Sequence, residues 1–565
     1  MPQHQVTDRR EALQRRFRDW RGWSVAELLD TVSEDHPDRP LVITDDRTYS
    51  YRDMQEWSAR LAAGLRASGV QPGEHVALVM ANYPEFVALK FAIARIGAVA
   101  VPVNYLLRRD ELAYVLEQSD AVLLVTMNRF RNFDYLAALD ELGGRRFPKL
   151  REVVVFSTDG DQRVGSRSLD DLARAAPELG TPLTDPGAPA DIIYTSGTTG
   201  TPKGVIVTHD MFLRTAYASA YTRAFEDGRR ILFALPLYHV FGYVEGLLAA
   251  LFAGGAIIPQ VAFDPVGTLQ AIEAHRASEV IMVPTMTLDV LDVARKKSFD
   301  LSSLRVVFSS GGQSPPSVWR DIKELLGAEE IFTGYGMTET TASTTCTFPD
   351  DPINRLATGN GRYKPAGVAG DPGLGGVLAV YKAVDLDTGG DLPSGSEGEL
   401  VVRGPSVTAG YYNKPEETAA AFDANGWLRT GDIGRIDAEG YLSLTGRKKE
   451  CYRCGGELVV PREVEDVLLG YPGIVQAHVV PVPHQRMGEV GAAFVVFDED
   501  LSPDPAAVIA HCTERLARFK VPAHVFPVAD VELPTSATGK VQKFVLAERA
   551  TREIGAVHAV TRPAV

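Results

Sequence analysis

Short apolar runs alternate with helix-like segments over most of the chain. The runs are HVALVMA (75–81), AVLLVT (121–126), ILFALPL (231–237), EVIMVPT (279–285) and LRVVFSS (304–310). They lack the polar alternation of a strand with one solvated face, so they indicate strands buried on both faces of a largely parallel sheet. Apolar residues over 83–97 recur instead at helical spacing and stop near Gly97, ahead of a further strand. The pattern predicts a layered α/β fold.

The pattern changes at about residue 367, where turn residues and short alternating strands become frequent. We therefore expect a small β-rich subdomain over about 367–445. A basic stretch, GRKKE (446–450), precedes a second α/β segment. A chain of 565 residues is also too long for one core. These features predict a large N-terminal domain over 1–445 and a small α+β C-terminal domain over 446–565.

Composition narrows the classes of function. The chain has 58 basic and 73 acidic residues, a net charge of −15 that argues against sequence-independent nucleic-acid binding. Four cysteines favour a reducing compartment. Cys451 and Cys454 form a C-x-x-C without a second pair, so we interpret them as two thiols on a loop rather than a zinc site.

Neither the N-terminal segment nor the longest apolar run suggests membrane insertion. The basic N-terminus has no apolar signal-peptide core, and we interpret it as a solvated helix, with a membrane-surface helix as the alternative. The longest apolar run, 246–259, is too short to span a bilayer and contains glycines. We expect a cytoplasmic protein without integral membrane contact.

The stretch YTSGTTGTPKGVIVTH (194–209) has the composition of an anion-binding loop. Its glycines let the backbone approach a ligand, its hydroxyl residues supply hydrogen bonds, and Lys203 adds a charge suited to phosphate. It is not a P-loop, because Pro202 stands in place of the second glycine and Gly204 in place of the final hydroxyl residue. A flexible linker is the alternative, but a linker needs neither the lysine nor the strand-like ADIIY before it.

Five further motifs follow this loop in order. They are LPLYHVFG (235–242), GYGMTET (334–340), WLRTGD (427–432), GRKKE (446–450) and PTSATGK (534–540). Together they resemble the adenylate-forming superfamily, in its branch of acyl-CoA synthetases and aryl-CoA ligases, over roughly residues 20–550. In that family a carboxylate attacks the α-phosphate of ATP, and a thiol then displaces AMP from the acyl adenylate. The resemblance implies a ligase that joins CoA to a bulky aryl, fatty or other apolar carboxylic acid.

The resemblance also assigns the nucleotide-binding residues. It implies that Glu339 and Thr198 hold Mg²⁺, that Thr338 contacts the α-phosphate, and that Asp432 holds the ribose hydroxyls. It also implies that Arg447 makes a second contact, to the ribose or to a phosphate. A helix cap for Glu339 and a turn aspartate for Asp432 are the readings without the family. The remaining ATP-binding residues implied are Thr195, Ser196, Gly197, Thr198, Thr199, Gly200 and Lys203 for the β- and γ-phosphates, and Gly312, Gly334, Tyr335, Gly336 and Met337 for the rest of the nucleotide.

A third group of implied residues serves catalysis and the second half-reaction. Lys540 matches the lysine that a mobile C-terminal domain delivers to the reacting phosphate, and Lys449 matches the hinge of that domain. His239 matches a residue at the mouth of the acyl pocket. Gly455 and Gly456 match the loop that borders the CoA tunnel, and Arg453 beside them is a candidate contact for the substrate or its phosphate. A surface turn around Lys540 and a structural role for His239 are the alternatives that the residues alone leave open.

Two departures from the family pattern concern the nucleotide. Leu458 stands where relatives carry a polar residue, and Gln313 stands where we expect a proline beside adenine. One alternative is therefore an enzyme that takes a ready-made acyl-AMP and only forms the thioester. A second hands the acyl group to a carrier protein acting in trans. A third, a regulator without chemistry, is disfavoured because the four motif residues are present: Lys203, Glu339, Asp432 and Lys540.

Overall fold

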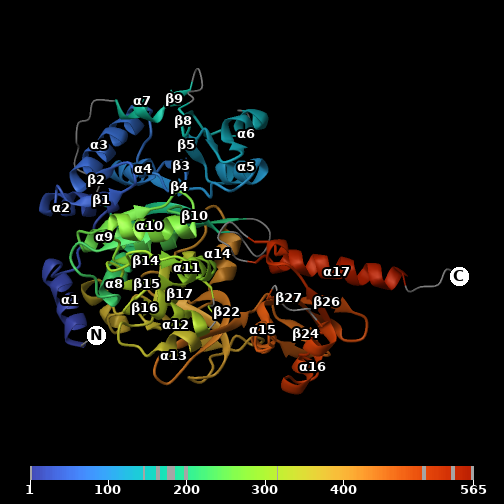
Figure 1. Cartoon of the computed structure of the whole chain (residues 1–565). Helices are drawn as coiled ribbons and strands as arrows, with labels where there is room; N and C mark the ends of the chain where they lie inside the picture. The colour runs from blue at the N-terminus through green and yellow to red at the C-terminus, as the bar shows by residue number, and fades with distance from the viewer. Residues whose placement is uncertain are drawn as a thin grey trace. The chain divides into compact units, whose positions relative to one another are not determined.

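The computed structural model of the chain describes residues 3–143, 147–160, 166–174, 185–195, 202–312, 314, 316–498, 504–535 and 541–560 (Figure 1). It divides into two compact units. Unit 1 comprises Met1–Val380 and Val402–Leu428, and unit 2 comprises Tyr381–Val401 and Arg429–Val565. Segments of the expected β-rich subdomain thus group with the C-terminal residues. The functional boundary at residue 445 stays a prediction.

Two seven-stranded sheets form the frame of unit 1 in the described residues. The first has the order β16 (Glu330–Phe332), β15 (Val306–Ser309), β14 (Glu279–Met282), β12 (Arg230–Phe233), β13 (Ala256–Pro259), β1 (Pro40–Ile43) and β2 (Thr48–Ser50). The second has the order β11 (Lys203–Thr208), β10 (Pro189–Thr195), β4 (Val99–Pro102), β3 (His75–Val79), β5 (Ala121–Met127), β8 (Glu152–Phe156) and β9 (Arg167–Ser168). All neighbouring strands are parallel except β1–β2 and β10–β11. The predicted layered α/β fold is confirmed.

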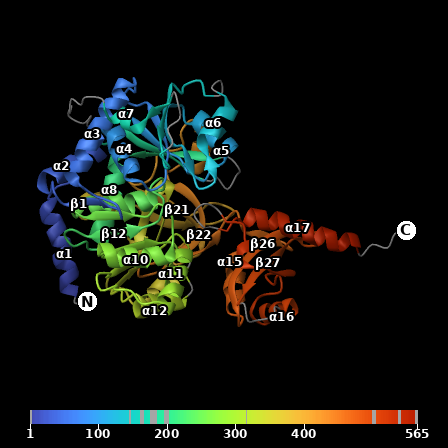
Figure 2. The ribbon, with the colours of Figure 1, turned by 45° about the horizontal axis from the view of Figure 1, so that its top comes forward.

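Helices fill the space between the two sheets and cover their outer faces (Figures 1 and 2). The helices of unit 1 are α1 (Gln3–Arg16), α2 (Val25–Asp35), α3 (Tyr51–Ala67), α4 (Pro84–Arg95), α5 (Arg109–Gln118), α6 (Tyr135–Leu142), α7 (Leu169–Ala173), α8 (His209–Thr222), α9 (Ala249–Phe252), α10 (Pro265–His275), α11 (Pro284–Lys296), α12 (Pro316–Leu325), α13 (Ile353–Thr358) and α14 (Pro415–Ala421). The described residues of unit 1 form two apolar cores, one on each face of the first sheet, and successive side chains of β12 point into different ones. Leu232 packs in the core with α10–α12, whereas Ile231 and Phe233 pack in the core that contains α4 and α8.

Two irregular elements lie beside the sheets of unit 1, where η1 contacts the first sheet and η2 contacts β11 of the second. A π-helix, η1 (Phe241–Leu248), precedes α9, and a short 3₁₀ turn, η2 (Thr338–Thr340), joins β17 (Gly334–Met337) to β18 (Ala342–Cys346). Strand β19 (Arg362–Tyr363) pairs with β18. Short strands β6 (Arg129–Phe130) and β7 (Phe133–Asp134) form a separate hairpin.

Unit 2 is built on two sheets. One has the order β20 (Val380–Val384), β21 (Gly398–Arg403), β22 (Leu428–Ile436) and β23 (Leu442–Arg447). The other contains β25 (Glu457–Val459), β24 (Tyr452–Cys454), β27 (Gly488–Phe497), β26 (Ile474–His484) and β28 (His524–Pro527). Its helices are α15 (Pro461–Leu469), α16 (Pro505–Arg515) and α17 (Lys543–Val560).

The basic N-terminal segment forms a helix that packs against unit 1. The N-terminal helix α1 buries Val6 and Leu13, and the Arg10 guanidinium donates to the carbonyls of Tyr221 and Thr222 at 2.9 and 2.8 Å. No helix within the described ranges is long and apolar enough to cross a bilayer.

The cysteines are all free thiols. Cys451 is half-buried just after the turn over 448–450, but Cys454 is the last residue of strand β24, so the expectation that both lie on a loop is wrong for Cys454. Tyr452 and Cys454 are buried while Arg453 between them is exposed, as strand alternation requires. Cys346 ends strand β18 and is also buried.

A buried ion pair fixes the strand that leads into the predicted anion-binding loop. Lys90 of α4 pairs with Asp191 of β10, and both side chains are nearly inaccessible, at 2% and 3% exposure. The Lys90 ammonium also lies 4.3 Å from the ring centroid of Tyr243 in η1. The pair therefore connects three elements of unit 1.

We expect Lys90→Met to lower the free energy of unfolding by about 3–5 kcal/mol, because it leaves the Asp191 carboxylate buried without a counter-charge. The double variant Lys90→Met/Asp191→Leu should recover most of this loss. Urea denaturation followed by tryptophan fluorescence measures the order of the three proteins. A double variant less stable than Lys90→Met would contradict this account.

Candidate active site

Several predicted site residues follow the carboxyl ends of parallel strands. His239 comes after β12, Gly312 after β15 and Gly334 after β16. The carboxyl ends of parallel strands meet at one edge of a sheet, where α/β proteins bind ligands. The Ser310 hydroxyl donates to the Gly334 carbonyl at 2.7 Å and joins two of these segments.

The glycines of GYGMTET are required by the hairpin that they form. A Cβ on Gly334 would lie 2.4 Å from the Thr345 carbonyl oxygen, and a Cβ on Gly336 would lie 1.8 Å from that of Ala342. Any side chain at either position would separate β17 from β18. Gly336 is exposed on its other side, as Gly312 is. Both leave backbone atoms open to a ligand.

The turn after this hairpin strand holds Thr338 and Glu339, which are 6% and 8% exposed. Thr341 and Ala342 follow with φ of 60° and 87°, a region that costs a β-branched residue energy. The Thr341 hydroxyl donates to the Ser406 carbonyl at 2.8 Å and its N–H to the Thr338 carbonyl at 3.0 Å. The turn is thus held by its surroundings.

Tyr411 links this turn to the lysine of the predicted phosphate loop. Its hydroxyl donates to Glu339 Oε1 at 3.0 Å, and the Lys203 ammonium lies 4.9 Å from its ring centroid. Burial, and then the Glu339 carboxylate, raise the pKa of Tyr411, so the phenol remains a donor at neutral pH. Tyr411 is absent from our sequence prediction; the GYY of residues 410–412 is its only local signal.

The two ends of the predicted phosphate loop lie in paired strands. Thr195 at the end of β10 is the register partner of Lys203 at the start of β11. A Cβ on Gly204 would lie 2.5 Å from Ile192 Cγ2, so this glycine serves strand packing. The Tyr412 N–H donates to the Gly204 carbonyl at 2.8 Å. The other predicted loop residues, Ser196, Gly197, Thr198, Thr199 and Gly200, lie outside the described residues.

His239 occupies the turn before η1 and is half-buried. Its Nδ1 accepts the Phe241 N–H at 3.2 Å. The neutral imidazole therefore carries its proton on Nε2. Phe241 and Val283 lie 4.0 and 3.4 Å from the position of a Cβ on Gly311, which is exposed, so apolar side chains flank open backbone near this histidine.

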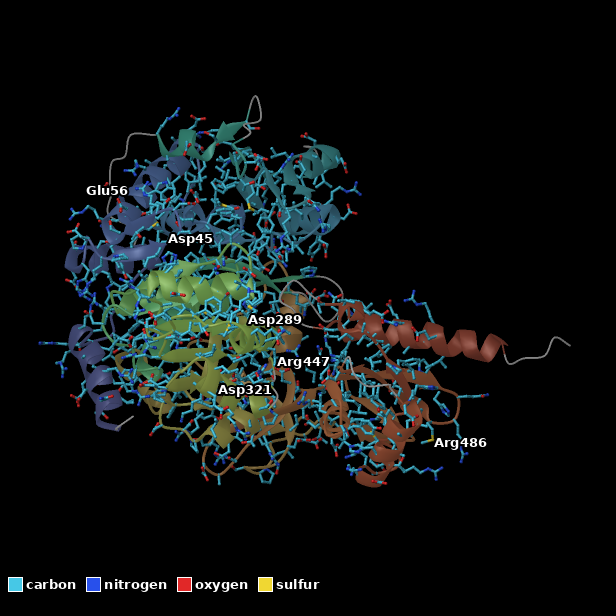
Figure 3. The ribbon with its side chains drawn as sticks, in the orientation of Figure 1. Asp45, Glu56, Asp289, Asp321, Arg447 and Arg486 are labelled. Carbon is cyan, nitrogen blue, oxygen red and sulfur yellow. The ribbon has the colours of Figure 1, made fainter. Side chains whose placement is uncertain are left out.

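In unit 2, Asp432 and Arg447 form one ion pair. They are register partners on β22 and β23, and the guanidinium lies 2.9 Å from Asp432 Oδ1 (Arg447 is labelled in Figure 3). The carboxylate is buried while Arg447 is about half exposed, which orients both groups. Lys448 is bound to Glu399 at 2.9 Å, whereas the predicted hinge residue Lys449 is exposed in the turn over 448–450.

The residues predicted to border the CoA tunnel form the hairpin β24–β25. Gly455 and Gly456 make its two-residue turn with φ of 62° and 93°, so the turn itself requires glycine. The Arg453 guanidinium donates to the Gly456 carbonyl at 3.1 Å and pairs with Asp387 at 2.8 Å. Leu458 is the register partner of Arg453.

The predicted catalytic residue Lys540 and the predicted departure Gln313 lie outside the described residues. The flanks of 536–540 are described: Thr535 and Val541 form a β-bridge. Lys543 pairs with Glu450 and Glu465, each at 2.7 Å. These pairs attach the start of α17 to the segment that follows the predicted hinge.

The residues present fit a Mg²⁺ ion. Mg²⁺ is commonly held by one or two carboxylates together with water and substrate phosphates, and Glu339 supplies a carboxylate oriented by Tyr411. The described residues contain no group of three or more His, Cys, Asp or Glu that would form a dedicated metal cage. Glu339 would therefore hold the ion together with nucleotide oxygens.

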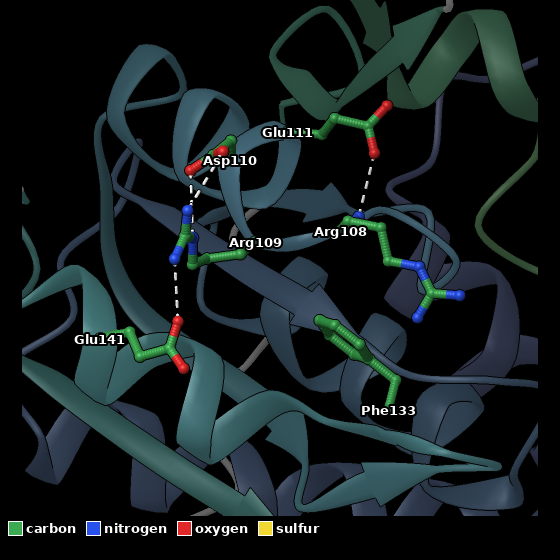
Figure 4. Close-up of a pocket in the computed structure, with 6 residues that line it drawn as sticks. All are labelled: Arg108, Arg109, Asp110, Glu111, Phe133 and Glu141. Carbon is green, nitrogen blue, oxygen red and sulfur yellow. Dashed lines mark hydrogen bonds and ion pairs between the residues drawn. The ribbon is translucent and has the colours of Figure 1, made fainter.

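A surface pocket of about 440 Å³ at the start of α5 is separate from all of these residues (Figure 4). Two of its charged side chains have partners in the lining, because the Arg109 guanidinium binds Glu141 at 2.9 Å and the Glu111 carboxylate accepts the backbone N–H of Arg108 at 3.0 Å. The Arg108 guanidinium lies over the Phe133 ring. None of the predicted site residues lines this pocket.

Comparisons with known proteins identify the family of the chain. Residues 29–412 match the family model of the AMP-binding enzymes, and residues 463–540 match the model of their C-terminal domain. The chain is 36% identical over 527 residues to the 3-[(3aS,4S,7aS)-7a-methyl-1,5-dioxo-octahydro-1H-inden-4-yl]propanoyl:CoA ligase of Mycobacterium tuberculosis, covering 92% of this chain and 97% of that protein. It is 31% identical to the medium-chain fatty-acid–CoA ligase of Escherichia coli, covering 97% and 94%.

A solved structure is similar over nearly the whole chain. It is the o-succinylbenzoate CoA synthetase of Bacillus subtilis in complex with its acyl-adenylate intermediate, at a TM-score of 0.76 and 27% identity, with 92% of this chain and 97% of that chain covered. The chain belongs to the AMP-binding enzyme family, the adenylate-forming superfamily that its motifs resemble. Within that family it is an ATP-dependent acyl-CoA ligase that joins a carboxylic acid to CoA through an acyl adenylate.

Replacing Tyr411 with phenylalanine isolates its hydroxyl, because the ring beside Lys203 is kept. We expect Tyr411→Phe to slow adenylation roughly 10- to 100-fold, the effect of losing a hydrogen bond of about 1.5–3 kcal/mol to a charged acceptor. ATP–pyrophosphate exchange measures this step. The neighbouring Tyr412→Phe is the matched control, since the Tyr412 hydroxyl donates to Asp120 instead. Equal losses in both variants would contradict a specific role for the Tyr411 hydroxyl.

Proposed function

We propose that this ligase acts on a bulky apolar carboxylic acid, an aryl or fatty acid or another apolar acid, and catalyses both half-reactions with Mg²⁺ and ATP. The observation that carries the acid class is the apolar surround of the exposed Gly311, where Val283 and Phe241 lie beside the carboxyl edge of the sheet. Apolar walls with few polar groups are typical of sites for apolar ligands.

The similar proteins support this acid class. The mycobacterial relative is named for a bicyclic propanoate, the Escherichia coli relative for medium-chain fatty acids, and the Bacillus structure for an aryl acid. The acids in these names differ in shape and in polar groups, and they share a carboxylate on a ring or chain body. A panel for this enzyme should therefore vary ring number and chain length.

In the proposed adenylation step, a carboxylate oxygen attacks the α-phosphorus of ATP and the bond to pyrophosphate breaks. Lys203 and its loop, with Thr195 and Thr198, would hold the β- and γ-phosphates, and Thr338 the α-phosphate. Glu339 and Thr198 would hold Mg²⁺, which lowers the charge repulsion between the reacting oxygens. The Nε2–H of His239 would orient the acid, and Lys540 would stabilise the charge that develops at the α-phosphate.

In the proposed second step, the CoA thiol attacks the acyl carbon and AMP leaves. Arg453 is paired with Asp387 in this structure, and it would break that ion pair to contact a phosphate of CoA. Asp432 and Arg447 would hold the ribose, for which the two carboxylate oxygens of Asp432 are suited. A rotation at Lys449 between the two steps is part of the same proposal.

One observation favours a second candidate function. Leu458 places an apolar side chain opposite Arg453 where we expect a polar nucleotide contact. An enzyme with weakened adenylation would depend on acyl-AMP made elsewhere and would still form the thioester. Transfer to a carrier-protein thiol instead of CoA is a further outcome of the test.

The test supplies the purified protein with single acids, ATP, Mg²⁺ and CoA, and follows pyrophosphate, acyl-AMP and acyl-CoA separately by mass spectrometry. A parallel assay starts from synthetic acyl-AMP and compares CoA with a carrier protein. We expect apolar acids to release pyrophosphate and yield acyl-CoA. Fast use of acyl-AMP with negligible pyrophosphate release would establish the thioester-only function, and preference for the carrier would reassign the acceptor.

Lys540→Ala separates the two half-reactions. We expect acyl-AMP formation to fall by roughly 10²–10³-fold, equivalent to about 3–4 kcal/mol of lost transition-state stabilisation. Thioester formation from synthetic acyl-AMP should persist, because Lys540 acts only on the first step. Lys543→Ala is the structural comparison, since Lys543 forms the ion pairs at the start of α17. Equal loss of both half-reactions in Lys540→Ala would rule out the assigned role.

A further inference from the structure

Glu245 is a fully buried acidic residue inside the otherwise apolar π-helix η1. Its carboxylate accepts hydrogen bonds from the Ser219 hydroxyl and from the Ser343 hydroxyl and N–H, and it pairs with Lys364 at 3.1 Å and Arg223 at 3.3 Å. Burial acts to raise the pKa of Glu245, but the Lys364 ammonium and the Arg223 guanidinium hold that pKa below its ordinary value. The carboxylate is therefore charged at neutral pH.

The first segment bound by this carboxylate is η1 itself. A π-helix is rare, and where it occurs it is frequently at a functional site. Arg223 donates to the backbone carbonyl of Glu245 at 2.7 Å, so it bonds the helix as well as the side chain. Gly242 and Gly246 let η1 approach the segment that leads to His239, because a Cβ on Gly242 would lie 2.8 Å from the Leu235 carbonyl oxygen. A change to α-helical hydrogen bonding would rotate the side chains of η1 relative to His239.

The second segment is the start of β18. Ser343 directly follows Thr341 and Ala342, the two residues with positive φ after the Glu339 turn. Lys364 binds the Ser343 carbonyl at 3.0 Å and hydroxyl at 2.9 Å, while Glu245 accepts the Ser343 N–H at 3.2 Å. A strained backbone persists only where the surrounding structure holds it in place. The bonds to Ser343 hold the C-terminal end of the strained pair Thr341 and Ala342.

We propose that Glu245 is a positioning residue that fixes the segment bearing Glu339 relative to the segment bearing His239. It contacts neither substrate; it holds the nucleotide side and the acid side of the site in one arrangement through η1 and β18. This inference rests on the roles proposed above for Glu339 and His239. Loss of the carboxylate should loosen both segments together and misalign the acid with the α-phosphate, with little change in fold elsewhere.

The first test measures backbone motion and needs no substrate. Hydrogen–deuterium exchange should increase roughly tenfold or more over residues 241–248 and 338–346 in Glu245→Gln, because a buried charged hydrogen-bond partner is lost. Glu330→Gln is the matched control: Glu330 is a buried carboxylate paired with Arg9, on β16, and contacts neither segment. Its exchange over the two segments should equal that of the wild type. Unchanged exchange in Glu245→Gln, or equal increases in both variants, would overturn the inference.

The second test separates positioning from charge balance. Glu245→Gln/Lys364→Met removes one charge of each sign and should recover thermal stability lost in Glu245→Gln. We expect ATP–pyrophosphate exchange to stay roughly 10–100-fold below that of the wild type in both variants, with thioester formation from synthetic acyl-AMP less affected. Wild-type adenylation in the double variant would show that Glu245 serves stability alone and would refute positioning.

The two tests also distinguish this inference from the proposed function. If no acid of the panel is adenylated by the wild type, the proposed acid class or the adenylation step fails, while the exchange experiment still reports whether Glu245 holds the two segments. If the wild type is active and the variants are equally active, only the positioning role of Glu245 fails.

Discussion

A carboxylate without access to water must find its counter-charges and hydrogen-bond donors inside the protein, and removing one partner is more costly than never burying the group. Glu245 imposes this requirement on unit 1. Its partners come from α8, from β18 and from the residue after β19, which are far apart in the sequence. Arg223 also pairs with Glu279 at the start of β14. The candidate site is thus attached to the sheet by charge as well as by apolar packing.

Three cationic side chains of the predicted site have internal partners in the described residues. Arg447 is paired with Asp432 and Arg453 with Asp387, and the Lys203 ammonium lies over the Tyr411 ring. These partners restrict the long side chains before a ligand arrives, so less conformational entropy is lost on binding. The buried Asp432 competes with a weak anion for Arg447, whereas the exposed Asp387 holds Arg453 only weakly. Such an arrangement favours polyanions such as nucleotides and CoA.

Much of the frame was predictable from local pattern. Continuous apolar runs marked the parallel strands, although the run over 231–237 ends as a strand at Phe233, where the chain leaves the sheet toward His239. Motif order identified the family. Tyr411 and the partners of Glu245 were not predictable, because their contacts join residues separated by up to 119 positions without any periodic signal. A single acidic residue in the apolar stretch after His239 was the only trace of that cluster.

The buried thiol of Cys346 has a practical consequence. It ends β18, three residues after Ser343, and burial raises its pKa to about 12. Because the thiolate is the reactive form, this cysteine is inert while the strand is in place. An alkylating reagent can modify it only during moments when that part of the core opens. The rate of alkylation of Cys346, followed by the mass of one peptide, therefore reports how often strand β18 beside the Glu339 turn opens.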